Sequence, residues 1–172
     1  MTPPAPSRKL RRRPRSDPSH GSAVQRPIGA KPSIPRRAVA EGWIRLLPRT
    51  MREIRQGRIE KGDPLAAGSL AGLAALKRTS ELLPHCHLVP LTFSRVDLRL
   101  SQGGVRGICL AETLWSTGVE MEALVGVTVA LLTVWDMVKY LEKDAGGQYP
   151  ATRLEGVRVT QKTLQRPRGA SP

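Results

Sequence analysis

Aromatic side chains are scarce in this chain of 172 residues, where phenylalanine, tryptophan and tyrosine together account for 3% of positions. The core must therefore be built from leucine, valine, isoleucine and alanine, and small residues of this kind favour close helix packing. Cysteine is also rare, because Cys86 and Cys109 are the only two in the sequence. Two cysteines provide no disulfide framework, which argues against a disulfide-rich secreted fold and fits a reducing compartment.

Long apolar runs are missing as well. The longest, residues 123–135, is too short to span a bilayer and lies between Glu122 and Asp136. Prolines and arginines rather than an apolar segment follow Met1, so we expect no secretory signal, no membrane contact and a cytoplasmic location. The sequence also contains no nucleophile elbow, P-loop, Rossmann glycine motif or zinc-protease helix, which removes several common enzyme classes.

Positive charge is plentiful and unevenly distributed, with a formal net charge of +14. Residues 1–40 contain ten lysines and arginines but one acid, whereas residues 41–172 contain eighteen and thirteen. We expect residues 1–35 to form a disordered basic tail rich in proline and arginine. That tail could contact a polyanion, be a solvated extension or act as a transit peptide, although its prolines argue against the helix that a transit peptide needs.

The rest of the chain reads as a single domain over residues 36–164, followed by a frayed end over residues 165–172. Its patterns predict a strand over 38–46, helices over 48–56 and 64–83, strands over 91–100 and 105–114, a helix over 117–144 and a strand over 153–164. Without the short helix this order is βαββαβ. We therefore predict an α+β, ferredoxin-like sandwich with an antiparallel four-stranded sheet and two helices on one face. The uncovered face of such a sheet suggests an oligomer.

Local signals support several of these boundaries. Asp63, which precedes a proline, is expected to be the N-cap of the long helix. Gly68 and Gly72 are four residues apart and predict a close contact with another helix. Thr117 and Glu120 have the spacing of a capping box, so we expect Thr117 to cap the last helix.

Two short segments near the long helix could carry chemistry. Lys61 precedes the helix start, where a lysine beside free backbone N–H groups suits a phosphate group, although this signal alone is weak. His85, Cys86 and His87 follow the helix end. Their spacing is poor for a metal and no fourth ligand is obvious, so we expect hydrogen-bonding or acid–base histidines, a buried cysteine, and no metal.

Asp136 and Lys139 share one face of the last helix because they are three residues apart. They are either a plain surface ion pair or a pocket pair in which Lys139 keeps Asp136 ionised as a base. Glu122 either interacts favourably with the positive N-terminal end of the same helix or contacts a ligand. Glu122 and Asp136 are 14 residues apart, or about 21 Å. Both can serve one ligand only at its opposite ends or from different subunits, and we favour different subunits.

Five segments, residues 57–63, 75–79, 83–87, 117–124 and 135–139, resemble the cyclic pyranopterin monophosphate synthases, also called molybdenum cofactor biosynthesis protein C. The resemblance covers roughly residues 30–164, and the TGVEMEAL and WDMVK segments are its most specific parts. It implies a homo-oligomer, a hexamer built as a trimer of dimers, with the active site at the dimer contact. It also implies a cofactor-free phosphorus–oxygen lyase that converts a cyclised dihydroguanosine triphosphate into cyclic pyranopterin monophosphate and releases pyrophosphate.

By position, the resemblance implies two sets of site residues. The catalytic set is Asp136, Lys61, Lys139, His87 and Lys77, with Asp136 as the acid/base, and the substrate-binding set is His85, Cys86, His87, Met121, Glu122 and Arg58. Lysines supply the cations that a triphosphate and a departing pyrophosphate need. An imidazole, a carboxylate and a lysine can move protons while the pterin ring opens and recloses. Which lysine is the acid and which only holds phosphate stays open.

The sequence departs from the family's usual pattern in three places. His85 and Leu88 flank the Cys-His pair where the family's loop more often reads Leu-Cys-His-Pro. Residues 25–28, Gln-Arg-Pro-Ile, stand where the family usually has Met-Val-Asp-Val. The tail before them has no counterpart in the resemblance.

A nucleic-acid-binding ferredoxin-like module that uses the basic tail is the alternative function. Such folds often bind RNA through aromatic side chains on the sheet. One phenylalanine and two tyrosines are few for that purpose, so we expect a small-molecule substrate rather than nucleic acid. A catalytically inactive relative would have lost the charged residues, which are all present here.

Overall fold

The computed structural model describes residue 21 and residues 23–164. Residues 1–20 and 22 of the expected basic tail, and the expected frayed end over residues 165–172, lie outside the described residues. The disorder predicted for them stays a prediction.

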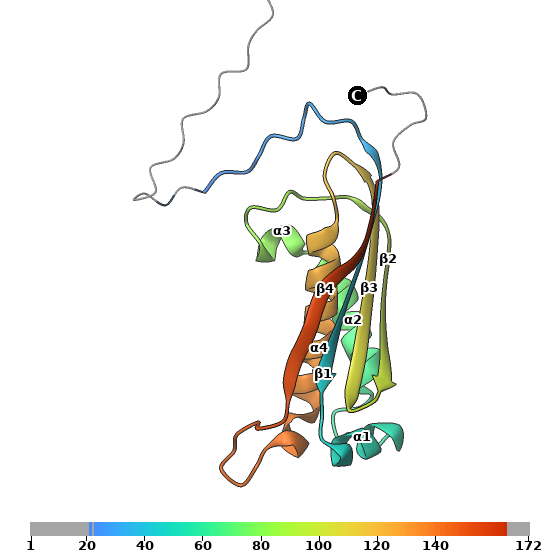
Figure 1. Ribbon diagram of the computed structural model, residues 1–172, viewed down its shortest axis with the longest axis vertical. Coiled ribbons are helices and arrows are strands. Elements are labelled where there is room, and N and C mark those ends of the chain that lie inside the picture. Colours follow the sequence, from blue (N-terminus) through green and yellow to red (C-terminus); the bar gives the residue numbers. More distant parts are fainter. Residues whose placement is uncertain (1–20, 22, 165–172) are drawn as a thin grey trace, which may run out of the picture.

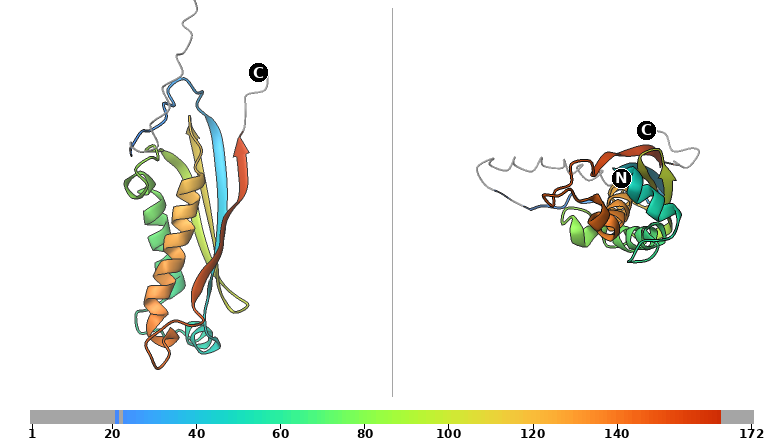
Figure 2. Two further views of the ribbon diagram at one scale, coloured as in Figure 1. Left: turned by 60° about the vertical axis from the view of Figure 1, so that its left-hand side comes forward. Right: turned by 90° about the horizontal axis from the view of Figure 1, so that it is seen from below.

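Four strands form one antiparallel sheet in the order β2-β3-β1-β4. The strands are β1 (Ile34–Arg45), β2 (Leu91–Ser101), β3 (Gly104–Trp115) and β4 (Arg153–Leu164), and the helices are α1 (Pro48–Arg55), α2 (Pro64–Leu76), α3 (Thr79–Leu82) and α4 (Glu120–Glu142). Helices α2 and α4 lie side by side on one face of the sheet, and the other face is open (Figure 1; Figure 2). The predicted α+β, ferredoxin-like βαββαβ arrangement is confirmed, with α1 as the extra short helix.

Among the described residues, the buried core between sheet and helices is aliphatic, as the composition predicts, and Trp135 packs against it as a partly buried side chain. Ala38, Ala40 and Ile44 alternate along β1 with residues of the open face, and all three are buried. A side chain on Gly107 of β3 would meet Val127 of α4 at 2.9 Å. The absence of a side chain on Gly107 therefore leaves the space that Val127 of α4 occupies.

The predicted close contact of the glycine pair is confirmed, and its partner is α4. A Cβ atom on Gly68 would lie 2.8 Å from the carbonyl oxygen of Ala130, and one on Gly72 would lie 2.5 Å from that of Gly126. Both distances are shorter than non-bonded carbon and oxygen atoms tolerate. Only glycine at these positions permits the observed spacing of α2 and α4.

The prediction of a single helix over residues 64–83 is wrong for the second half of that range. α2 ends at Leu76, and α3 begins at Thr79 as a separate short helix. The Thr79 hydroxyl donates a hydrogen bond to the Leu76 carbonyl oxygen at 2.9 Å, so a side chain competes with the helical ladder at this point. The break places α3 beside the first turns of α4 (Figure 1).

The predicted capping box is also wrong. α4 begins at Glu120 after Val119, and no side chain caps it. The Glu120 carboxylate instead forms an ion pair with Lys162 of β4. A partner from another strand therefore replaces the local cap that the spacing of Thr117 and Glu120 suggested.

Among the described residues, α4 is the one helix whose length and apolarity would fit a bilayer, with a mean hydropathy of 1.7 over its most apolar window. Half of that window is buried inside the protein, because α4 packs against α2, β1 and β3. This burial is typical of the core helix of a globular domain.

Candidate active site

Three charged side chains meet near the end of α4. Lys139 Nζ lies 2.7 Å from Oδ1 of Asp136, and Lys61 Nζ lies 2.8 Å from Oδ2 of the same carboxylate. Lys61 comes from the connection between α1 and α2, where Gly62 adopts a φ of 93°. That left-handed turn suits glycine and ends at Asp63, whose carboxylate accepts from the N–H groups of the first turn of α2 as predicted.

The two lysines change the acidity of the cluster. The ammonium groups of Lys139 and Lys61 lower the pKa of Asp136 to about 2, and Lys139 makes the larger contribution. In return, the Asp136 carboxylate raises the pKa of Lys139. All three side chains are about half exposed, so an anionic ligand can reach both ammonium groups.

A second group of predicted residues lines a cavity of about 290 Å³ near the start of α4. His85, Cys86 and His87 form one wall, and the other wall is formed by Thr117, Gly118, Glu120, Met121 and Glu122. Glu122 is 4% exposed, and burial raises its pKa. Burial also raises the pKa of Cys86, with a smaller contribution from the Glu122 charge. The cavity therefore presents imidazoles and a carboxyl group that is more readily protonated than usual.

Arg58 and Lys77 join neither group. The Arg58 guanidinium forms two hydrogen bonds, of 2.7 and 2.9 Å, with the Glu53 carboxylate of α1, which raises the Arg58 pKa. Lys77 is exposed at the C-terminal end of α2. The structure therefore gathers Lys61, Asp136 and Lys139 in one place and His85, Cys86, His87, Met121 and Glu122 in another.

The two gathered groups lie at opposite ends of α4. The cavity adjoins the first turn of the helix near α3, whereas Asp136 lies in the part of the helix near α1 (Figure 1). The 14 residues between Glu122 and Asp136 correspond to about 21 Å of helix. Within one chain the two groups do not surround a common small cavity.

The open face of the sheet carries a charged network that sequence reasoning missed. Glu41 of β1 is 5% exposed and accepts from Arg106 at 2.6 Å and from Arg158 at 2.8 Å. The Arg106 guanidinium also lies 5.3 Å from the ring centre of Trp43. Trp43 is thus covered rather than free to stack on a base, which weakens the nucleic-acid alternative. The sequence signal for this network was Glu41 itself, an acid at an open-face position between Val39 and Trp43.

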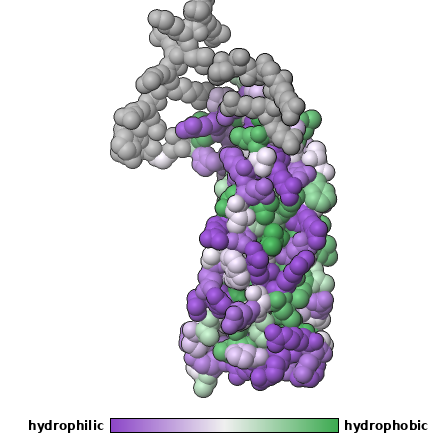
Figure 3. Space-filling view, turned by 45° about the vertical axis from the view of Figure 1, so that its right-hand side comes forward, coloured by the Kyte–Doolittle hydropathy of each residue, from purple (hydrophilic) through white to green (hydrophobic). Residues whose placement is uncertain are grey.

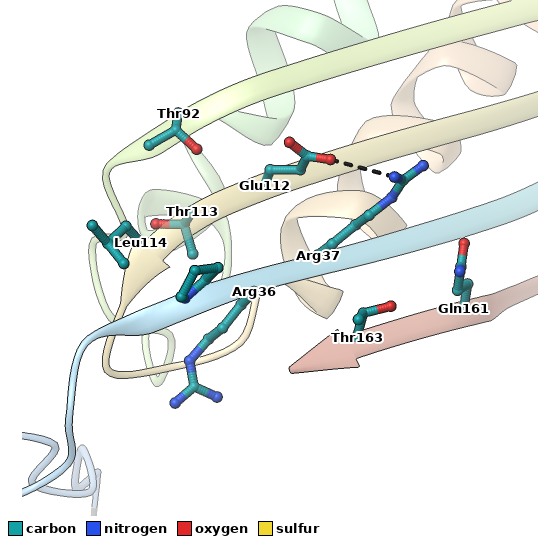
Figure 4. Close-up of a pocket in the computed structure, with 9 residues that line it drawn as sticks. Arg36, Arg37, Thr92, Glu112, Thr113, Leu114, Gln161 and Thr163 are labelled. Carbon is teal, nitrogen blue, oxygen red and sulfur yellow. Dashed lines mark ion pairs between the residues drawn. The ribbon is translucent and has the colours of Figure 1, made fainter. Parts of the chain in front are cut away.

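A larger cavity, of about 420 Å³, lies at the end of the sheet where β1 begins (Figure 4). Figure 4 shows Arg37 of β1 reaching toward Glu112 of β3, and the pair is 3.6 Å apart. Thr92 of β2 and Gln161 of β4 lie at its two sides. None of the predicted site residues lines this cavity, so it does not belong to the candidate site.

The fold and the clustered charges define a class: an α+β ferredoxin-like domain with a cationic site. Within the described part of the chain, no group of three or more His, Cys, Asp or Glu side chains is placed to hold a metal ion. The chain belongs to the MoaC family, whose model matches residues 26–164.

Relatives from several archaea are similar over most of their length. A probable cyclic pyranopterin monophosphate synthase of Pyrococcus abyssi is 52% identical over 135 residues, which are 78% of this chain and 85% of the relative. A protein of the same name from Methanoregula boonei is 47% identical over 144 residues, or 84% of this chain and 93% of the relative. One from Sulfurisphaera tokodaii is 45% identical over 135 residues, or 78% and 89%.

Proposed function

We propose that this protein acts as a cyclic pyranopterin monophosphate synthase in molybdenum cofactor biosynthesis. Its substrate is a cyclised dihydroguanosine triphosphate, and its products are cyclic pyranopterin monophosphate and pyrophosphate. The cluster of Lys61, Asp136 and Lys139 carries this proposal, because two ammonium groups share one carboxylate at a site that solvent can enter. When the cyclic phosphate forms, a P–O bond breaks and pyrophosphate is released without the addition of water. We therefore class the reaction as that of a phosphorus–oxygen lyase.

The cluster suits a polyphosphate that must lose pyrophosphate. Lys139 stays protonated because Asp136 raises its pKa, so it can stabilise or protonate the departing phosphate oxygen. A bound phosphate competes with Asp136 for both lysines. Loss of those contacts returns the pKa of Asp136 toward the ordinary value of 3.8, which makes the carboxylate a stronger base than it is in the free cluster.

The cavity near the start of α4 suits the heterocycle of the substrate. A purine-derived ring system presents several N–H and C=O groups to its surroundings, and imidazoles and a carboxyl group can both donate to and accept from such groups. His85, His87 and Glu122 supply these functions around the cavity. His87 is the side chain we assign to proton transfer, and Met121 covers the ring with an apolar surface.

Because the two halves of the site lie at opposite ends of α4 within one chain, we propose that each complete site combines one half from each of two subunits. An antiparallel pair of chains would bring the His87 end of one α4 to the Asp136 end of its partner. The proposed hexamer, a trimer of such dimers, also covers exposed apolar side chains such as Phe93, Leu114 and Val157. Figure 3 shows apolar surface of this kind between polar stripes along one side of the molecule.

Mixing two inactive variants tests whether the site is shared. Chains with Asp136→Ala and chains with His87→Ala should each be inactive alone. After co-assembly, half of the randomly formed dimers carry both types, and one of their two sites is intact, so about a quarter of wild-type turnover returns. No recovery despite mixed assembly, verified by two affinity tags, would place the whole site within one chain.

Turnover itself is the primary test of the function. Incubation with the cyclised triphosphate should yield pyrophosphate and cyclic pyranopterin monophosphate, and Asp136→Ala or Lys61→Ala should abolish both products without dissociating the oligomer. Lys143→Ala, an exposed lysine one turn after Lys139, is the matched control and should retain activity. Full activity in either site variant contradicts the assignment.

We also propose a cytoplasmic location, which the two unpaired cysteines support.

A further inference from the structure

Residues 23–33, which precede β1, run across the end of the molecule that holds the histidine cavity (Figure 1). We call this segment the strap. It has no regular secondary structure apart from a turn at Gly29 and Ala30, and most of its residues are exposed. It nevertheless forms hydrogen bonds with both walls of the cavity.

One end of the strap is attached to the loop before α4. The Ser116 hydroxyl donates to the carbonyl oxygen of Lys31 at 2.9 Å and lies 3.5 Å from the Ser33 hydroxyl. Ser116 immediately precedes Thr117 and Gly118, which line the cavity. This end of the strap is therefore fixed to the wall that leads to Glu122.

The other end is attached to the histidine loop. The Gln25 side-chain amide donates to the carbonyl oxygen of Cys86 at 2.6 Å, and Nδ1 of His85 lies 3.2 Å from the carbonyl oxygen of Val24. A carbonyl oxygen can only accept, so Nδ1 of His85 carries the hydrogen in this bond. In the neutral imidazole, Nε2 is then left as an acceptor.

We propose that the strap positions the His85–His87 loop for substrate binding and fixes the tautomer of His85. Val24 and Gln25 act as positioning residues, while His85 presents its free Nε2 as an acceptor for an N–H group of the substrate ring. The proposal rests on the proposed function for the identity of the ligand, but the tautomer of His85 does not depend on it.

Nitrogen-15 NMR of the full-length protein with labelled histidine tests the tautomer. The chain has only three histidines, so single substitutions assign the signals. In the wild type at alkaline pH, the His85 signals should show a protonated Nδ1 and an unprotonated Nε2. Gln25→Glu has the same shape but cannot donate to Cys86, and we expect it to shift His85 toward a mixture of tautomers.

Kinetics provide the second readout. Gln25→Glu should raise KM about three- to tenfold, as expected for loss of one hydrogen bond, and should change kcat little. Gln161→Glu, which makes the same charge change at an exposed position of β4, should alter neither KM nor the His85 signals. An unprotonated Nδ1 in the wild type, or identical behaviour of the two variants, overturns the proposal. A wild type with the expected tautomer but no turnover would instead contradict the proposed function.

Discussion

Lys61 Nζ lies 2.8 Å from Oδ2 of Asp136, although the two residues are 75 positions apart in the sequence. Lys139, one turn after Asp136 on α4, approaches the other carboxylate oxygen at 2.7 Å. The carboxylate is therefore held between a local partner and a distant one. Only the second partner depends on how the connection before α2 folds onto α4.

The acidity of Asp136 should depend on both lysines. Lys139→Met should raise the Asp136 pKa above its value of about 2, and Lys61→Met should raise it by less, because Lys139 is the larger cause of the shift. Carbon-13 NMR titration of the aspartate carboxyl groups measures both changes. Lys143→Met should leave the Asp136 titration unchanged, and an equal response to all three substitutions would show that general charge rather than contact sets it.

The same pKa predicts how acid affects the cluster. Because folding lowers the Asp136 pKa from 3.8 to about 2, its contribution to stability is fully present above pH 3.8 and is lost as the pH falls through about 2. In the double variant Lys61→Met/Lys139→Met this pH dependence should disappear. Denaturant unfolding of both proteins over this acid range measures the difference, and an unchanged slope in the double variant contradicts the assignment.

Glu122 should destabilise the protein at neutral pH. Burial raises its pKa, so the group favours folding below its ordinary pKa, and that contribution is lost as the pH rises through the folded-state value. We expect Glu122→Gln to increase the free energy of unfolding at neutral pH by about 1 kcal/mol while weakening turnover. Denaturant unfolding at neutral and mildly acidic pH should show the gain shrinking as the pH falls; a constant gain would point to a packing effect.

Gly72→Ala should separate α2 from α4. The new Cβ would lie 2.5 Å from the Gly126 carbonyl oxygen and 2.9 Å from the Ala130 side chain, so the helices must move apart. We expect a loss of about 1–3 kcal/mol, despite the better helix propensity of alanine. Thermal unfolding at fixed protein concentration is the measurement. Gly146→Ala, whose nearest atom would be 3.4 Å away, should be close to neutral.

Glu142 should be the most sensitive buried polar residue. Its fully buried carboxylate accepts from the Leu47 N–H at 3.1 Å and from the Thr152 hydroxyl, and so joins the end of α4 to the start of α1 and to the segment before β4. Glu142→Ala leaves both donors unsatisfied and should cost about 2–4 kcal/mol. Glu142→Gln keeps an acceptor for Leu47 and should cost much less, as chemical denaturation can check. Similar losses in both variants would mean that the charge matters more than the hydrogen bonds.

The sequence determined the order of the elements, because each has a strong local signal. Hydrophobic alternation marks the β2–β3 hairpin, Asp63 caps α2, and the scarcity of aromatics requires the aliphatic core that the structure shows. The pairing of Asp136 with Lys139 also follows from their spacing on one helix. Local patterns also singled out Lys61, the His85–His87 segment and Glu122, whereas Arg58 and Lys77 came only from the family resemblance.

Tertiary structure decided the features that depend on distant partners. Glu120 bonds to Lys162 instead of joining a capping box, Thr79 interrupts the long helix, and Lys61 reaches Asp136 across the fold. No local sequence pattern predicts such contacts, because the number of residues between two partners does not indicate which of their atoms meet in the folded chain. The strap is the same kind of feature: its composition predicts a loop, and only the folded chain shows Gln25 bonded to Cys86.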